Sequence, residues 1–181
     1  MIQIRNVLIS ALTGVASVAS LGGIAHAQAS ASQATQSTVT VFRPITLTKN
    51  TDLSFGTVVR PATGSGTITI SQTDGSRSLS GSGALLSTGP NAAPGRATYT
   101  VNGEGGQTFS ISVPANFNMT RSGGSETITV VLTPTATTGT LSNALGQAGS
   151  STFGVGGQIP INDTTASGAY TGSFTTTVAY N

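Results

Sequence analysis

The C-terminal stretch, residues 168–181, constrains the fold most because its side chains alternate in character. Aromatic and β-branched residues recur at every second position, and mostly hydroxyl-bearing residues lie between them. The members of the first face are Tyr170, Gly172, Phe174, Thr176, Val178 and Tyr180. A repeat of two residues with one apolar face predicts a β-strand that is half buried against a core. We expect its backbone edge to pair with a strand of the same or another molecule.

Residues 1–27 have the pattern of a secretory signal peptide. Arg5 gives a positive start, residues 7–24 are largely apolar and small, and Ala25-His26-Ala27 forms a small-x-small cleavage site before Gln28. A membrane anchor would need about 20 strongly apolar residues, whereas serines, threonines and glycines interrupt this run. We therefore expect cleavage after Ala27, no membrane span after cleavage, and a protein in the periplasm, on the outer cell surface or outside the cell.

Charge is scarce after residue 27. Without Arg5 the chain keeps six basic residues against five acidic ones, a net charge of +1. They are scattered and form no run that would follow a phosphate backbone, so nucleic acid is not an expected partner. The chain has no cysteine, so its stability must come from sheet hydrogen bonds and an apolar core. Uncharged strands also lack the charge repulsion that keeps the sheet edges of different molecules apart. The low charge therefore favours a protein that assembles. The alternative is a durable extracellular domain that does not assemble.

The rest of the chain predicts strands and turns, with no segment of helical period. Residues 28–37 are small and polar and indicate a flexible leader before a domain at residues 38–181. Residues 102–106 and 122–125 are expected to be hairpin turns. The expected strands are residues 38–49, 53–59, 67–70, 96–101, 108–113, 117–121, 126–132, 152–161 and 168–181, with a short strand or irregular loop within residues 76–95. About nine or ten short strands predict an all-β fold, an immunoglobulin-like or Greek-key β-sandwich.

The composition argues against an enzyme. After residue 27 the chain has no histidine and no cysteine, which removes the usual general base, the thiol nucleophile and the commonest zinc ligands. Asp74, Glu104 and Asp163 lie in expected turns, and Asp52 and Glu126 lie at strand starts, where solvated charges are ordinary. No calcium-loop or phosphate-loop spacing occurs. We therefore expect no catalytic residue, metal or cofactor.

Five motifs resemble an exported bacterial family of unknown function. They are Leu53-Ser-Phe-Gly56, Asp74-Gly-Ser-Arg77, Tyr99-Thr-Val-Asn-Gly103, Gly154-Val-Gly-Gly157 and the ending at residues 168–181. In this order they are similar to the domain-of-unknown-function family 4402 over most of the chain after residue 27. The resemblance implies an exported domain and says little about activity.

The ending also resembles the C-terminal signature of chaperone-usher pilus subunits and of spore-coat protein U-like domains. Gly168 is the fourteenth residue from the end, Tyr180 is penultimate, and the side chains between them alternate. The resemblance implies an incomplete, pilin-like sandwich whose missing strand comes from the N-terminal extension of the next subunit, with a periplasmic chaperone on the last strand. It implies that residues 28–47 are the donor segment. The residues implied in assembly are Val39, Val41, Ile45 and Leu47 of that segment and Gly168, Tyr170, Phe174, Val178 and Tyr180 of the last strand.

Two functions follow as expectations. The first is an exported, non-enzymatic structural or adhesive protein of the cell surface, a pilus- or coat-like subunit that forms homo-oligomers by strand addition. The alternative is a complete, self-contained and monomeric sandwich that binds an extracellular glycan or protein. In that case the binding residues are expected at loop tips such as residues 102–106 or 142–150.

Overall fold

The structure, a computed structural model, describes residues 30–90 and 93–181. The expected signal peptide and its cleavage site therefore lie outside the described residues. The chain divides into two compact units, Met1–Val39 and Thr40–Asn181. Residues 30–39 of the first unit are exposed and have no regular secondary structure, whereas every described strand belongs to the second. No helix in the described part is long and apolar enough to span a membrane.

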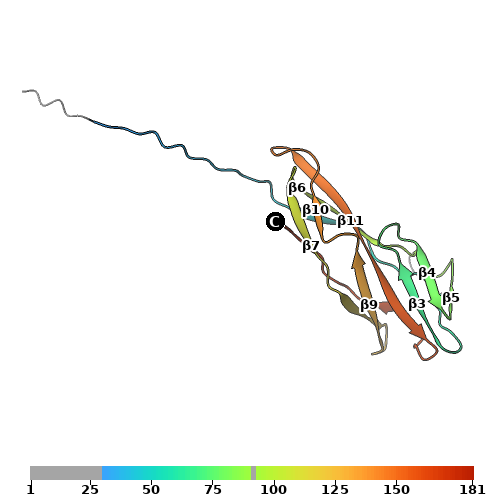
Figure 1. Cartoon of the computed structure of the whole chain (residues 1–181). Helices are drawn as coiled ribbons and strands as arrows, with labels where there is room; N and C mark the ends of the chain where they lie inside the picture. Colours follow the sequence, from blue (N-terminus) through green and yellow to red (C-terminus); the bar gives the residue numbers. More distant parts are fainter. Residues whose placement is uncertain (1–29, 91–92) are drawn as a thin grey trace, which may run out of the picture. The chain divides into compact units, whose positions relative to one another are not determined.

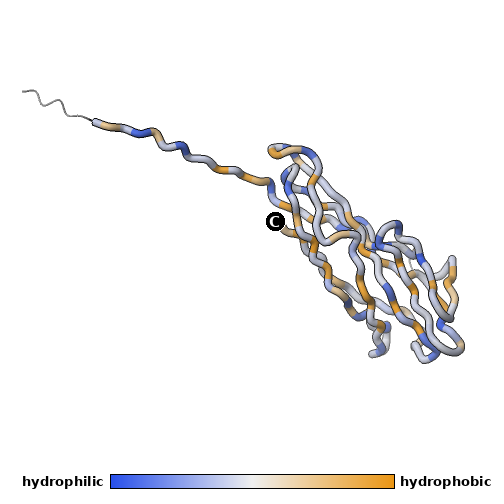
Figure 2. The backbone as a smooth tube through the Cα atoms, viewed as in Figure 1, coloured by the Kyte–Doolittle hydropathy of each residue, from blue (hydrophilic) through white to orange (hydrophobic). Residues whose placement is uncertain are grey.

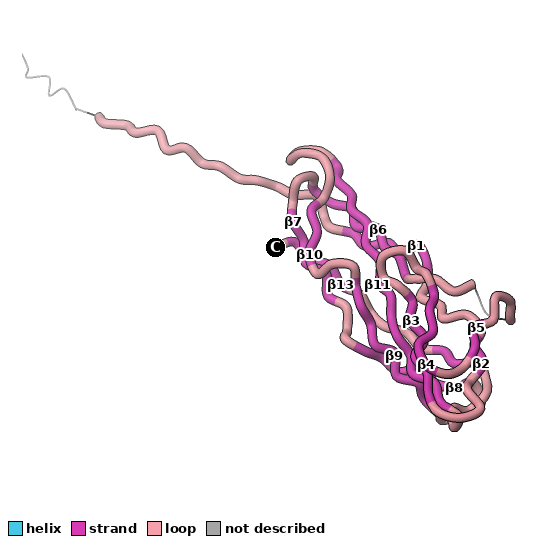
Figure 3. The backbone as a smooth tube through the Cα atoms, turned by 45° about the vertical axis from the view of Figure 1, so that its right-hand side comes forward, coloured by secondary structure: helices cyan, strands magenta, loops and turns pink. Residues whose placement is uncertain are grey.

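All regular structure in the described residues is β-structure, which confirms the expected all-β class (Figure 3). The thirteen strands are β1 (Thr46–Thr51), β2 (Val58–Val59), β3 (Ser65–Ile70), β4 (Arg77–Gly81), β5 (Ala84–Leu85), β6 (Ala97–Glu104), β7 (Thr108–Ser112), β8 (Asn116–Arg121), β9 (Thr127–Pro134), β10 (Thr138–Thr140), β11 (Ala148–Asn162), β12 (Tyr170–Thr171) and β13 (Thr177–Tyr180). The count exceeds the expected nine or ten because several strands are only two or three residues long and the C-terminal stretch forms two strands.

Three antiparallel sheets make up the second unit (Figure 1). The large sheet has the order β1-β6-β11-β9-β8-β12, with β3 beside β11 and β4 beside β3. β11 joins both parts of this sheet, since residues 148–155 pair with β6 and residues 157–162 pair with β3. The smaller sheets are β10-β7-β13 and β2-β5. This arrangement is consistent with the expected β-sandwich.

One of the two expected hairpins is confirmed and the other is wrong. β8 and β9 pair with each other on either side of residues 122–125. β6 and β7 do not pair, because β6 lies between β1 and β11 whereas β7 lies between β10 and β13. The chain between β6 and β7 therefore crosses from the large sheet to a small one. Residues 102–106 are not a hairpin turn, and residues 102–104 belong to β6 itself.

The core is filled mainly from the large sheet and from β7, with Leu141 after β10 and Phe55 before β2 added from outside the strands. The least exposed large side chains are Phe109, Ile68, Ile70, Leu141, Val101, Val130 and Val155. Buried and less buried positions alternate along β3 and β6, as expected for strands with one face on a core, and Figure 2 shows the apolar positions spread along the strands. Burial of these side chains is the main favourable contribution to folding.

Gly156 allows β11 to pass close to the end of β3. A Cβ atom at this position would lie 2.5 Å from the backbone nitrogen of Gln72, so only glycine fits without a backbone shift. This close approach explains the glycine at position 156 of the Gly154-Val-Gly-Gly157 motif, which the sequence alone indicated only as a kink in a strand.

Candidate functional site

The C-terminal segment, residues 170–180, keeps the alternation seen in its sequence. The half-buried positions are Tyr170, Phe174, Thr176, Val178 and Tyr180, and the residues between them are exposed. Gly168 precedes the segment, is exposed, and has a backbone φ of 149°. The half-buried face that the repeat of two predicts is therefore present.

This segment forms two short strands rather than one. β12 pairs with β8 at an edge of the large sheet, and β13 pairs with β7 in a small sheet, so the segment bridges the two. Gly172 follows β12 and lies against the backbone of β8, where a Cβ atom would be 2.6 Å from the carbonyl oxygen of Asn118. The expected single strand over residues 168–181 is thus interrupted where the chain changes sheets.

Residues 172–176 join β12 to β13 and have an unpaired backbone. They belong to no strand and form no hydrogen bond with any other described residue. Phe174 holds them to the domain by packing against Phe117, with ring centroids 5.2 Å apart. The Thr176 Oγ1 atom is buried without a hydrogen-bond partner in the described part of the chain. Because backbone N–H and C=O groups are strong hydrogen-bonding groups, this stretch offers a free strand edge.

β1 and β13 are edge strands that approach each other without pairing. Among the described strands, β13 pairs only with β7 and β1 pairs only with β6, although the two strands are neighbours.

The expected donor residues divide into two groups. Val39 and Val41 have exposed fractions of 86% and 81%. Ile45 and Leu47 are instead partly buried against the core of their own domain, and Leu47 lies in β1, which pairs with β6 of the same chain. Of these four residues, only the two valines are highly exposed.

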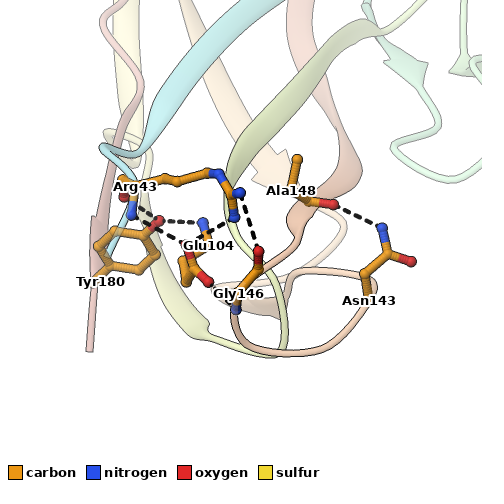
Figure 4. A network of polar contacts seen from close by, with 6 residues as sticks. All are labelled: Arg43, Glu104, Asn143, Gly146, Ala148 and Tyr180. Atoms are coloured by element: carbon orange, nitrogen blue, oxygen red, sulfur yellow. Dashed lines mark hydrogen bonds and ion pairs between the residues drawn. The ribbon is translucent and has the colours of Figure 1, made fainter. Parts of the chain in front are cut away.

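A polar network fixes the chain just before β1 to the C-terminal Tyr180 (Figure 4). Arg43 donates from its backbone nitrogen (3.2 Å) and from Nη1 (3.1 Å) to Glu104 Oε2, and from Nη2 to the Gly146 carbonyl (3.1 Å). The Tyr180 hydroxyl donates to the Arg43 carbonyl (2.9 Å) and accepts from the backbone nitrogen of Glu104 (2.7 Å). The ring of Phe42 packs edge-on against Tyr180, with centroids 5.8 Å apart.

Glu104 is the buried centre of this network. It is 2% exposed, and its Oε1 atom accepts a hydrogen bond from the Gly146 amide. The loop that carries Gly146 is closed by a bond from Asn143 Nδ2 to the Ala148 carbonyl (2.7 Å). The Gly146 amide, together with the amide and guanidinium of Arg43, lowers the pKa of Glu104 although burial opposes them. The expectation that Glu104 lies at the tip of a hairpin turn is wrong, because Glu104 belongs to β6.

Comparison with known proteins identifies a family. The sequence model of the family described as Domain of unknown function (DUF4402) matches residues 45–180, which confirms the first of the two resemblances. No curated protein and no solved structure matches the chain. The matched residues include all thirteen described strands, whereas Val39 and Val41 precede them.

Proposed function

We propose that this chain, which belongs to the DUF4402 family, is an exported structural or adhesive protein of the cell surface that assembles by β-strand addition. The observation that carries the proposal is the unpaired backbone of residues 172–176 between two paired strands. In strand addition, an extended segment of a partner forms main-chain hydrogen bonds with a free edge, and its alternate side chains fit the surface beneath. The half-buried Phe174 and Val178 provide such a surface.

The leader of a second copy supplies the added strand. Val39 and Val41 are separated by one residue, so their side chains lie on the same face of an extended segment, and β-branched residues favour strands. From Phe42 onward the chain contacts its own domain, so the free donor ends at Val41. Before assembly, a periplasmic chaperone would occupy the same edge. No enzymatic activity is proposed, because the chain after residue 27 contains neither histidine nor cysteine.

Size-exclusion chromatography with light scattering tests this assembly. We expect residues 28–181 to form oligomers that grow with protein concentration, and a chain that begins at Phe42 to remain monomeric. Replacing Val39 and Val41 together by aspartate should also give monomers, because charged side chains do not fit an apolar face. Both valines are exposed, so the unfolding temperature of the monomer should stay the same.

The matched control places the same charges on the other face of the leader. Aspartates at Thr38 and Thr40, which are also exposed, should leave assembly intact. A monomer at every concentration of the full chain would contradict the proposal and favour the self-contained binding module. Oligomers that tolerate Val39→Asp with Val41→Asp would show that the leader is not the donor.

A further inference from the structure

A pocket of about 420 Å³ lies in the second unit, and none of the residues of the Tyr180 network lines it. Its lining comes from two segments, residues 52–58 with Arg60 and residues 165–168 with Tyr170, which we call the walls, and from side chains of β8, β9 and β11, which we call the floor. Its apolar lining includes Leu53, Phe55, Met119, Ile128, Ile159 and Ile161. A cavity of roughly 150 Å³ is enough for benzene, and ligand pockets start at roughly 300 Å³. The pocket can therefore hold a ligand well above the size of one aromatic ring.

The rim of this pocket carries one uncompensated positive charge. Asp52 is paired with Lys49, whereas Arg60 forms no ion pair with any described residue. Arg60 is exposed, and its Nη1 atom donates to the Thr165 carbonyl at 2.8 Å, which connects the two walls. The remaining guanidinium donors make no bond to the described chain, so they are available to an anion.

We propose that this pocket binds the hydrocarbon chain of an aliphatic carboxylate, with the carboxylate group at Arg60. The apolar floor favours methylene groups, because each buried methylene adds to the hydrophobic free energy of binding. The hydroxyl-bearing lining residues, Ser54, Thr57, Thr165, Ser167 and Tyr170, come from residues 52–60 and 165–170, whereas the lining side chains from β8, β9 and β11 are all apolar. The pocket uses neither the leader nor residues 172–176, although Gly168 and Tyr170 of the C-terminal stretch line it, and its ligand is tested separately from strand addition.

Met119 provides a single reporter inside the pocket. The chain has two methionines, Met1 and Met119, so residues 28–181 released from a cleavable tag contain only the second. With ¹³C-methyl methionine, the protein gives one methyl resonance from a side chain that lines the pocket. We expect decanoate to shift this resonance in a saturable manner, and decanoate to bind about tenfold more tightly than octanoate because it buries two more methylenes.

Charge variants at the rim test the position of the carboxylate. At low ionic strength, Arg60→Gln should weaken decanoate binding about two- to fivefold and leave the binding of uncharged 1-octanol unchanged. Asp52→Asn, the matched control, removes a negative charge from the same rim and should bind decanoate at least as tightly as the original chain. Both residues are exposed, so neither change should prevent folding.

Several results would overturn the proposal. A Met119 resonance that does not respond to decanoate would exclude the ligand class. If Asp52→Asn weakened decanoate binding as much as Arg60→Gln does, decanoate affinity would depend on the geometry of the rim and not on the charge of Arg60. A resonance that shifts with protein concentration and ignores decanoate would identify the occupant as the leader of a second copy, and the chain that begins at Phe42 would then lose this shift.

Discussion

Replacing Phe109 by alanine is expected to lower the free energy of unfolding by about 3–5 kcal/mol, the largest effect of any single change considered for this chain. Phe109 is 1% exposed and lies in β7, the central strand of the sheet that holds β10 and β13. Its ring fits against Gly139, where a Cβ atom would be 2.5 Å from the ring. Removing the ring leaves a cavity beneath the strand that anchors the C-terminus.

Urea-induced unfolding, followed by circular dichroism, measures this loss. Phe42→Ala serves as the control because Phe42 is 43% exposed and packs its ring edge-on against the ring of Tyr180. We expect the control to lose about 1 kcal/mol or less. If Phe109→Ala lost no more than the control, the small sheet could not be packed on the core in the way described.

Replacing Glu104 by glutamine is expected to lower the midpoint of thermal unfolding by about 10 °C. The buried carboxylate accepts bonds from Arg43 and Gly146, and an amide removes the negative charge and replaces one acceptor by a donor. Glu126→Gln is the matched control, since Glu126 pairs with Arg121 but its side chain is 45% exposed. The control should lose a few degrees at most, because exposed ion pairs contribute little. Equal losses in the two variants would mean that burial of Glu104 has no energetic consequence.

The Glu104 carboxylate makes the free energy of unfolding depend on pH, and the direction of this dependence follows from its pKa. The pKa of Glu104 is lower in the folded chain than its ordinary value, so the ionised form favours folding. This contribution is present above the unfolded pKa, about 4.3, and is lost as pH falls through the folded pKa. We expect the original chain to lose stability below about pH 4, and Glu104→Gln to lose less over the same interval. If the original chain and Glu104→Gln lost stability equally as the pH falls, Glu104 would not be the source of this pH dependence.

The repeat of two residues in the C-terminal segment could be predicted from sequence because it depends on neighbouring residues. It places Tyr170, Phe174, Val178 and Tyr180 on one half-buried face, as observed. The interruption at residues 172–176 could not be predicted, because it depends on which distant strands, β8 and β7, pair with each end. The same alternation is compatible with one continuous strand or with two strands in different sheets.

The polar network around Glu104 was missed for a related reason. A glycine-rich stretch between two apolar segments has the local pattern of a hairpin, and a carboxylate at a hairpin tip is ordinarily solvated. At least one of these glycines is required for close packing of two backbone segments, because a Cβ atom at Gly105 would lie 2.5 Å from the Ala144 carbonyl oxygen. Glycines on both sides of a carboxylate were the one available signal that another backbone approaches it closely.

Hydrogen–deuterium exchange of residues 172–176 tests strand addition most directly. The account predicts that these amides exchange rapidly in the monomeric chain that begins at Phe42 and become protected in assembled residues 28–181, because the added strand provides the missing hydrogen bonds. The β7–β13 pair, which is already hydrogen-bonded, should be protected in both samples and serves as the internal control. Oligomers in which residues 172–176 still exchange as fast as in the monomer would contradict the account.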